Sequence, residues 1–219
     1  GDDSHKVVMV SNDRVLPKFR TVIPNVMMRG GEATEESLLW WFSVVMSHIL
    51  RPSPSLSEVV RKHRASLPER YLAMHVRRGH KWVETSPHPL SAYVAAAANI
   101  STTTGVTDVL VVTEDPEVEA RLRYMEPPLT TSKGGGLKFH FTAHTRRGYR
   151  VSIPQCLRMG ILSAGEENEI SLVNLLLAAG AEGFVGAFSS GWSKRAFELM
   201  VAKQNRVPLH VSLDGLWGP

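Results

Sequence analysis

Apolar positions along the chain follow two patterns, one with helical spacing and one with short continuous runs. After Thr34, a residue type that caps helices, two acids occupy the first turn and apolar side chains recur every three or four positions until Pro52. By contrast, residues 109–112 read Val-Leu-Val-Val, which is typical of a strand buried on both faces. The apolar positions of the first pattern are Leu38, Leu39, Phe42, Val45, Met46, Ile49 and Leu50.

Over the whole chain, the two patterns predict helices that alternate with strands. The predicted strands cover residues 71–76, 109–112, 138–142, 183–188 and 206–211. The predicted helices cover about 34–50, 56–66, 89–99, a short charged stretch after 116, 170–179 and 192–204, while 143–165 lack a regular pattern. Such alternation predicts the α/β class, with a Rossmann-like, mostly parallel sheet and helices on both faces. Residues 67–219 would form this compact unit, and 1–66 a helical lead-in that packs on the sheet.

The composition is that of a globular protein, with 43% hydrophobic and 21% charged residues in a chain of 219. No apolar run is long enough to cross a membrane. The net charge of +4 suits an anionic ligand, but the basic residues are dispersed with few aromatics among them, so nucleic-acid binding is not expected. Cys156 is the single cysteine, and the sequon at Asn99 is a weak indication of a secretory compartment.

Polar residues with ligand-binding chemistry follow three of the predicted strands. Arg77 and Arg78 follow the first, an acidic pair at 114–115 follows the second, and Ser189 and Ser190 follow the fourth. In a parallel sheet these strand ends share one edge, where ligands bind. Guanidinium groups match phosphate oxygens, and a helix that begins after the serines would add backbone N–H donors. Each feature has an alternative interpretation, as surface charges or as a simple helix cap, but together they predict a diphosphate site.

Two other chemistries fit the sequence poorly. Residues 187–191 approach a nucleophile elbow, but His210 and Asp214 follow it in the wrong order for a serine hydrolase. His140 and His144 lie on a predicted strand and loop, with no carboxylate at ligand spacing, so a zinc site is not expected. No Asp-x-Asp pair occurs, so the common carboxylate clamp for a divalent ion is absent from the sequence.

Residues 75–81, His-Val-Arg-Arg-Gly-His-Lys, resemble the His-Val-Arg-Arg-Thr-Asp-Lys motif of the α1,6-fucosyltransferases. This family includes the core fucosyltransferase of N-glycans and bacterial nodulation relatives. The resemblance continues in order and with similar gaps over about residues 38–202. The matching stretches are 39–41, 50–54, 88–93, 112–116, 186–190 and 196–200.

This resemblance implies the GDP-fucose-binding half of a GT-B-like, inverting glycosyltransferase that needs no metal or other cofactor. His75 would lie near the guanine, and Arg77 would bind the β-phosphate and stabilise the departing GDP. Arg78 is expected to assist at the diphosphate, and Ser189 and Ser190 would add hydroxyl and amide contacts to it.

The resemblance also implies roles on the acceptor side and in base recognition. Lys81 and Glu84 would handle the acceptor hydroxyl, with Glu84 as general base. Two positions depart from the family pattern, because His80 and Asn174 each stand where the family has an aspartate. A carboxylate accepts both guanine N–H donors whereas an amide offers one acceptor, so Asn174→Asp is expected to tighten guanine binding.

Three functional hypotheses follow. The first is an enzyme that transfers fucose from GDP-fucose to a glycan or glycoprotein in the Golgi or secretory lumen, with membrane attachment only through a segment absent from this chain. The second is a non-catalytic module that keeps a sugar-nucleotide or glycan pocket without turnover. The third is a phosphate-ligand-binding domain of unrelated function.

Overall fold

The computed structural model describes residues 34–78, 88–124, 136–144, 146, 153–161 and 163–218. Its strands are β1 (Leu72–His75), β2 (Asp108–Val112), β3 (Lys138–His140), β4 (Gly183–Gly186) and β5 (Leu209–Ser212). Its helices are α1 (Glu35–Ile49), α2 (Pro54–Ala65), α3 (Leu90–Thr104), α4 (Pro116–Arg123), α5 (Ile153–Arg158), α6 (Ala164–Ala178) and α7 (Gly191–Gln204). All five predicted strands are present, and each lies within three residues of its expected bounds.

The five strands form one sheet in the order β3-β2-β1-β4-β5, and every neighbouring pair is parallel. Met74 in β1 is in register with Val111 on one side and with Val185 on the other. The strand order reverses between β1 and β4. A doubly wound sheet binds its ligands beside such a reversal, at the carboxyl ends of the strands. The predicted α/β class is therefore confirmed.

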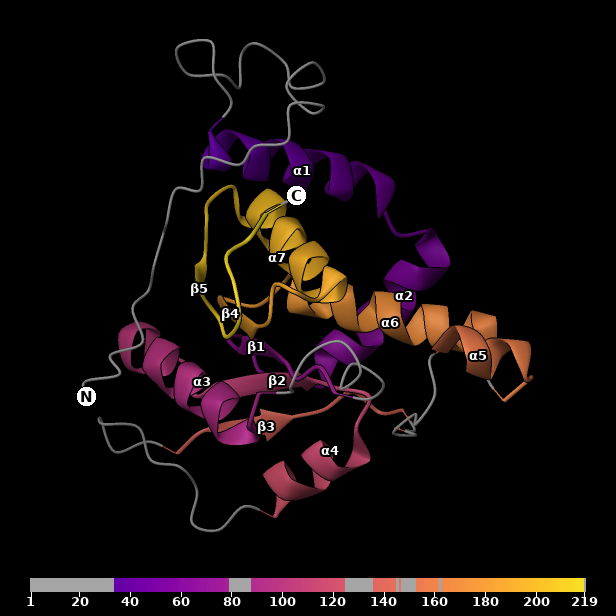
Figure 1. The fold of residues 1–219 in the computed structure, drawn as a ribbon. Coiled ribbons are helices and arrows are strands. Elements are labelled where there is room, and N and C mark those ends of the chain that lie inside the picture. Colours follow the sequence, from indigo (N-terminus) through magenta and orange to yellow (C-terminus); the bar gives the residue numbers. More distant parts are fainter. Residues whose placement is uncertain are drawn as a thin grey trace.

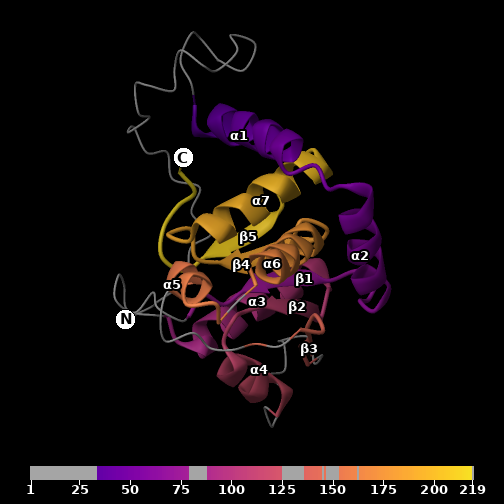
Figure 2. The same ribbon diagram turned by 90° about the vertical axis from the view of Figure 1, so that its right-hand side faces the viewer.

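Helices cover both faces of the sheet (Figures 1 and 2). Since successive residues of a strand point to opposite faces, each strand contributes side chains to two separate cores. Ala73 and Leu110 pack in a core with α6 and α7. Leu72, Met74 and Val111 pack in a second core with α3 and α4. Both cores consist of buried aliphatic and aromatic side chains, and buried His75 is a polar residue at the carboxyl end of the central strand β1.

The lead-in helices reach the sheet through other helices. Figure 1 shows α1 lying across α7, and α2 packs against α6. Thr34 caps α1 as predicted, through a reciprocal capping box with Ser37. The apolar stripe of α1 is only partly buried: Leu38 and Leu39 are covered, whereas Ile49 is 65% exposed. The division of the chain at residue 66 stays a prediction.

Three helices differ from the sequence pattern for local reasons. The stretch predicted to be irregular contains α5 and the start of α6, whose first turn holds Glu166 and Glu167 at the positive end of the helix dipole. Helix α3 continues to Thr104, with the hydroxyls of Thr102 and Thr104 bonded to carbonyls one turn back, and Gly105 ends it at φ 74°. The sequon at Asn99 thus lies inside a helix with Ser101 buried, not in a surface loop.

No helix in the described part of the chain is long and apolar enough to cross a membrane.

Candidate functional site

A cavity of about 200 Å³ lies at the carboxyl ends of β1 and β2 and is bounded by α6 and the first turn of α7. Its volume is below the roughly 300–1,000 Å³ of sites that enclose a whole drug-sized ligand, and it suits one ring or one end of a larger molecule. It is lined by His75, Arg77, Val112, Thr113, Glu114, His144, Arg146, Glu167, Asn168, Ile170, Ser171, Asn174 and Trp192.

Arg77 and Glu114 join two of the predicted strand ends in an ion pair. The Nη1 atom of Arg77 donates to Oε1 of Glu114 at 2.5 Å, and each side chain is about one-third exposed. Burial raises the pKa of Glu114, and the Arg77 charge opposes this increase. A phosphate at Arg77 would therefore compete with a carboxylate that is already in place.

Arg78 follows Arg77 beyond the end of β1, where the chain is no longer part of the strand. It does not line the cavity. Its charge acts instead on Tyr93 of α3. Burial raises the pKa of Tyr93, the Asp214 charge raises it further, and the Arg78 charge lowers it. The Nε atom of Arg78 is buried and has no hydrogen-bond partner among the residues that the structure describes. Of the two adjacent arginines expected at the diphosphate, Arg77 lines this cavity and Arg78 does not, while Arg146 from the segment after β3 also lines it.

An aromatic wall closes the β1 side of the cavity. Strand β4 ends at Gly186, where a Cβ atom would lie 2.7 Å from the ring of Phe184 and 2.9 Å from Oγ of Ser193. Glycine therefore permits the first turn of α7 to approach β1, where Oγ of Ser193 lies 2.7 Å from Nδ1 of buried His75. The ring of Trp192 then lies 4.3 Å from the His75 ring, at 38°.

Asn174 lies deep in the cavity, and its orientation is fixed by the segment that follows β3. The hydroxyl of Thr142 donates to Oδ1 of Asn174 at 2.8 Å, and Nδ1 of His144 lies 3.0 Å from the same hydroxyl oxygen. Because the single hydroxyl hydrogen is used by Asn174, Nδ1 of His144 carries the hydrogen of that second bond. Burial, followed by the Arg146 charge, lowers the pKa of His144 to about 4, so the ring is neutral at pH 7.

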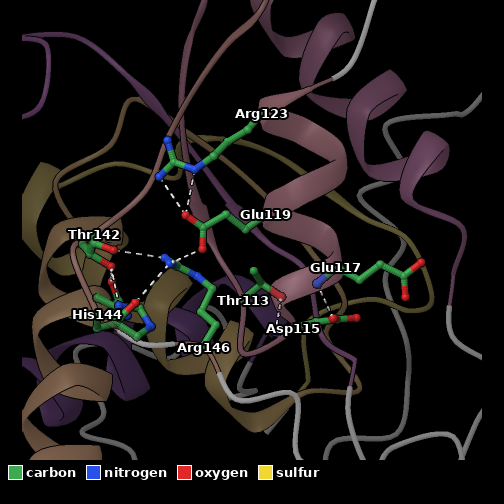
Figure 3. A network of polar contacts seen from close by, with 9 residues as sticks. Thr113, Asp115, Glu117, Glu119, Arg123, Thr142, His144 and Arg146 are labelled. Carbon is green, nitrogen blue, oxygen red and sulfur yellow. Dashed lines mark hydrogen bonds and ion pairs between the residues drawn. The ribbon is translucent and has the colours of Figure 1, made fainter.

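Figure 3 shows a polar network beside this chain of hydrogen bonds, and it extends from buried Arg146 to half-exposed Arg123. Arg146 has a side chain only 2% exposed, and it donates to Glu119 at 2.6 Å and to the carbonyl of Thr142 at 3.2 Å. Glu119 also pairs with Arg123, so the three side chains carry a net positive charge. Sequence analysis missed Arg146, although the strand-end argument that found Arg77 applies equally to the segment after β3.

Ser189 and Ser190 are not among the residues that line the cavity. The amide of Ser189 donates to Oδ1 of Asp214 at 3.2 Å, and the amide of buried Ser190 donates to the carbonyl of Ala187 at 3.0 Å. Ser190 caps α7 without a side-chain hydrogen bond. The turn after β4 is therefore held by its own neighbours, and its predicted role at a phosphate stays a prediction.

The remaining predicted residues divide into two groups. Lys81, Glu84 and His80 lie outside the described residues. His140 and His144 have different partners: Nε2 of His140 lies 2.7 Å from Oδ1 of Asp108, whereas Nδ1 of His144 lies 3.0 Å from the Thr142 hydroxyl. Within the described ranges, no three His, Cys, Asp or Glu side chains are grouped so that they could hold a metal ion.

The sequence matches no protein-family model and no curated protein sequence. Among solved structures, the chain is similar to crystal structures of POFUT1. The complex with GDP-fucose has a TM-score of 0.48 and 14% identity, over 74% of this chain and 47% of that chain. The complex with GDP has a TM-score of 0.45, with the same identity and coverage. The chain thus spans about half the length of these solved chains.

Proposed function

We propose that the chain binds a GDP-sugar in this cavity, with GDP-fucose as donor, and forms the nucleotide-binding half of a fucosyltransferase-like enzyme. The observation that carries the proposal is Arg77 at the carboxyl end of β1, beside the reversal of strand order, in a cavity with an aromatic wall. The resemblance of residues 75–81 to a fucosyltransferase motif supports the choice of donor.

The exposure of the lining residues supports an orientation for the nucleotide. Asn174 is 4% exposed, whereas the side chain of Arg77 is 33% exposed. A charged diphosphate loses less hydration at the open end, and a flat base loses less at the buried end. The diphosphate would accordingly contact Arg77, while the base would lie against Trp192 and reach Asn174.

The reaction would transfer fucose to a hydroxyl of a glycan or glycoprotein in the secretory lumen, with inversion and without a metal. Arg77 would hold the departing diphosphate, because a guanidinium stays charged and donates two parallel hydrogen bonds. Glu84, as general base, would take the proton of the acceptor hydroxyl, with Lys81 beside it. These acceptor-side roles rest on the sequence resemblance.

A non-catalytic sugar-nucleotide or glycan-binding module is the second candidate. It is favoured by Asn174, which stands where the family pattern has an aspartate and whose amide oxygen is already engaged by Thr142. Such a module would bind the nucleotide but would release no GDP in the presence of acceptor glycans, whereas the enzyme would release it.

Calorimetric titration with GDP-fucose, GDP and UDP tests the proposal. We expect GDP-fucose and GDP to bind, and Arg77→Ala to abolish measurable binding while far-UV circular dichroism stays unchanged. Arg77→Lys should weaken binding at least about tenfold, because a point charge cannot reproduce the forked hydrogen bonds. Glu114→Gln should strengthen binding, since it releases Arg77 from its carboxylate partner.

Arg61→Ala is the matched control for these variants. Arg61 forms a comparable ion pair with Glu58, at 2.6 Å, on an exposed part of α2 away from the cavity. Unchanged affinity is expected for Arg61→Ala. Equal affinity of wild type and Arg77→Ala for GDP would refute a diphosphate site at Arg77.

A further inference from the structure

We propose that a second cavity, in the helical layer of the fold, binds a small carboxylate with an apolar chain. This cavity has a volume of about 340 Å³ and lies where the corner between α1 and α2 meets the last turns of α6 and α7. Its volume falls within the roughly 300–1,000 Å³ of small-molecule sites, which often form between packed helices. It shares no lining residue with the cavity at Arg77, so the inference does not rest on the proposed function.

Most of the wall of this second cavity is apolar. Ser47 of α1 and Ser57 of α2 line it, but each hydroxyl donates to a backbone carbonyl about one turn back, at 2.8 and 2.9 Å. Their hydrogens are therefore already used within the helices. The other uncharged side chains of the lining are hydrocarbon groups, and Ala179 and Ala202 leave space because they are small. Such a wall favours the hydrocarbon part of a ligand over water.

Lys203 of α7 is the one charged side chain among the described residues that line the second cavity. Its ammonium lies beside Gly180, the exposed neighbour of Ala179 in the lining. A Cβ atom at Gly180 would lie 3.2 Å from Nζ of Lys203 and 2.9 Å from the Tyr71 hydroxyl, so glycine keeps the space next to the ammonium open. Within the described ranges, no carboxylate forms an ion pair with Lys203. The ammonium can therefore accept an anion as its partner.

A second positive charge acts on this end of the second cavity. Arg64 of α2 donates to the carbonyls of Leu67 at 3.1 Å and Glu69 at 2.8 Å, and its Cζ atom lies 5.1 Å from the centre of the Tyr71 ring. These contacts fix the guanidinium in place but do not neutralise its charge. Burial, followed by the Arg64 charge, lowers the pKa of Lys203. A carboxylate here would offset the repulsion between the two cations and accept charge-assisted hydrogen bonds from the ammonium.

Calorimetric titration of the wild-type chain with octanoate, octanol and octylammonium tests the inference directly. The three compounds share one apolar chain and differ in the charge of the head group. We expect saturable binding of octanoate, and binding of octanol at least about tenfold more weakly, the effect of one charge-assisted hydrogen bond. Octylammonium should bind more weakly than octanol, because Lys203 and Arg64 repel it. Equal affinities for octanoate and octanol, or no saturable binding of octanoate, would overturn the inference.

Lys203→Met supplies the second arm of the test, because methionine keeps an unbranched apolar side chain without the charge. Octanoate should bind to this variant at least about tenfold more weakly, while the affinity for octanol stays unchanged. Lys138→Met is the matched control, since Lys138 is an exposed lysine of β3 that does not line the second cavity. It should bind octanoate as the wild type does. Unchanged octanoate affinity in Lys203→Met, or an equal loss in both variants, would overturn the inference.

Two further variants locate the bound carboxylate. Ala202→Leu fills part of the second cavity from α7, so it should abolish binding of both octanoate and octanol while far-UV circular dichroism stays unchanged. A folded Ala202→Leu chain that binds octanoate as the wild type does would overturn the inference. Arg77→Ala should bind octanoate with wild-type affinity, because Arg77 lies in the other cavity. Loss of octanoate binding in Arg77→Ala but not in Lys203→Met would place the carboxylate at the strand ends and would also overturn the inference.

Discussion

Removal of the titrating group at residue 144 should flatten the pH dependence of folding stability on the acid side. Burial is the main reason why the pKa of His144 falls from 6.5 to about 4, and the charges of Arg146 and His63 lower it further while Glu119 opposes them. Between these two pH values the unfolded chain holds a proton on His144 that the folded chain does not hold. Stability is therefore fully retained above pH 6.5, falls as the pH decreases towards 4, and levels off below that value.

The size of this effect follows from the two pKa values. A difference of about 2.5 pH units, at about 1.4 kcal/mol per unit, gives a loss of at most about 3.5 kcal/mol. This is a large part of the roughly 5–15 kcal/mol that stabilises a typical domain. In the folded protein, protonation would also place a second cation against Arg146 in the network of Figure 3.

Urea unfolding of wild type and His144→Gln at several pH values between about 4 and 7.5 measures this contribution. The glutamine side chain of the variant does not titrate, so the difference in unfolding free energy between the two proteins should change by about 3 kcal/mol across this range. The comparison cancels the contributions of other titrating groups, which both proteins share. Two curves that run parallel over the whole range would refute the argument that burial keeps His144 neutral.

Three further outcomes are expected. Gly186→Ala should destabilise the fold by about 1–3 kcal/mol in urea unfolding, because its Cβ would overlap a phenylalanine ring; Gly165→Ala, in α6 with room for a methyl group, should be neutral or stabilising. Trp217→Phe should cost about 1.5–3 kcal/mol, because it removes the 3.0 Å hydrogen bond from the indole to the fully buried carboxylate of Glu198; an unchanged urea midpoint would count against this. Affinity for GDP, measured by calorimetry, should be the same in EDTA as in Mg²⁺, and a strong loss in EDTA would contradict a metal-independent site.

Local sequence patterns predicted the elements of the sheet because their signals lie within a few residues. The Val-Leu-Val-Val run of β2 and the apolar run at 183–188 that contains β4 predicted strands without reference to the rest of the chain. The same patterns predicted the wrong end for helix α3. Helix α3 runs to Thr104, beyond its expected end at 99, because Ile100 and Ser101 are buried in the core and the left-handed Gly105 ends the helix.

Only some of the contacts in the candidate site could be predicted from the sequence. The strand-end argument correctly brought Arg77 and Glu114 together, because parallel strands share an edge. It could not show that Arg78 would lie beside Tyr93, or that the Ser189 amide would bond to Asp214. Those outcomes depend on which helix covers each face and on where the segment after β5 lies.

The sequence by itself determined the succession of strands and helices and the edge of the sheet at which polar residues gather, because both follow from the apolar pattern of contiguous segments. Only the tertiary structure decided which of those polar residues share a cavity. Thr142 and Asn174 are 32 positions apart, and the Thr142 hydroxyl donates a hydrogen bond to the amide oxygen of Asn174. Arg146 becomes a buried network residue only because α4 places Glu119 beside it. The burial and hydrogen-bond partner of a side chain depend on segments distant in sequence, and no local pattern encodes them.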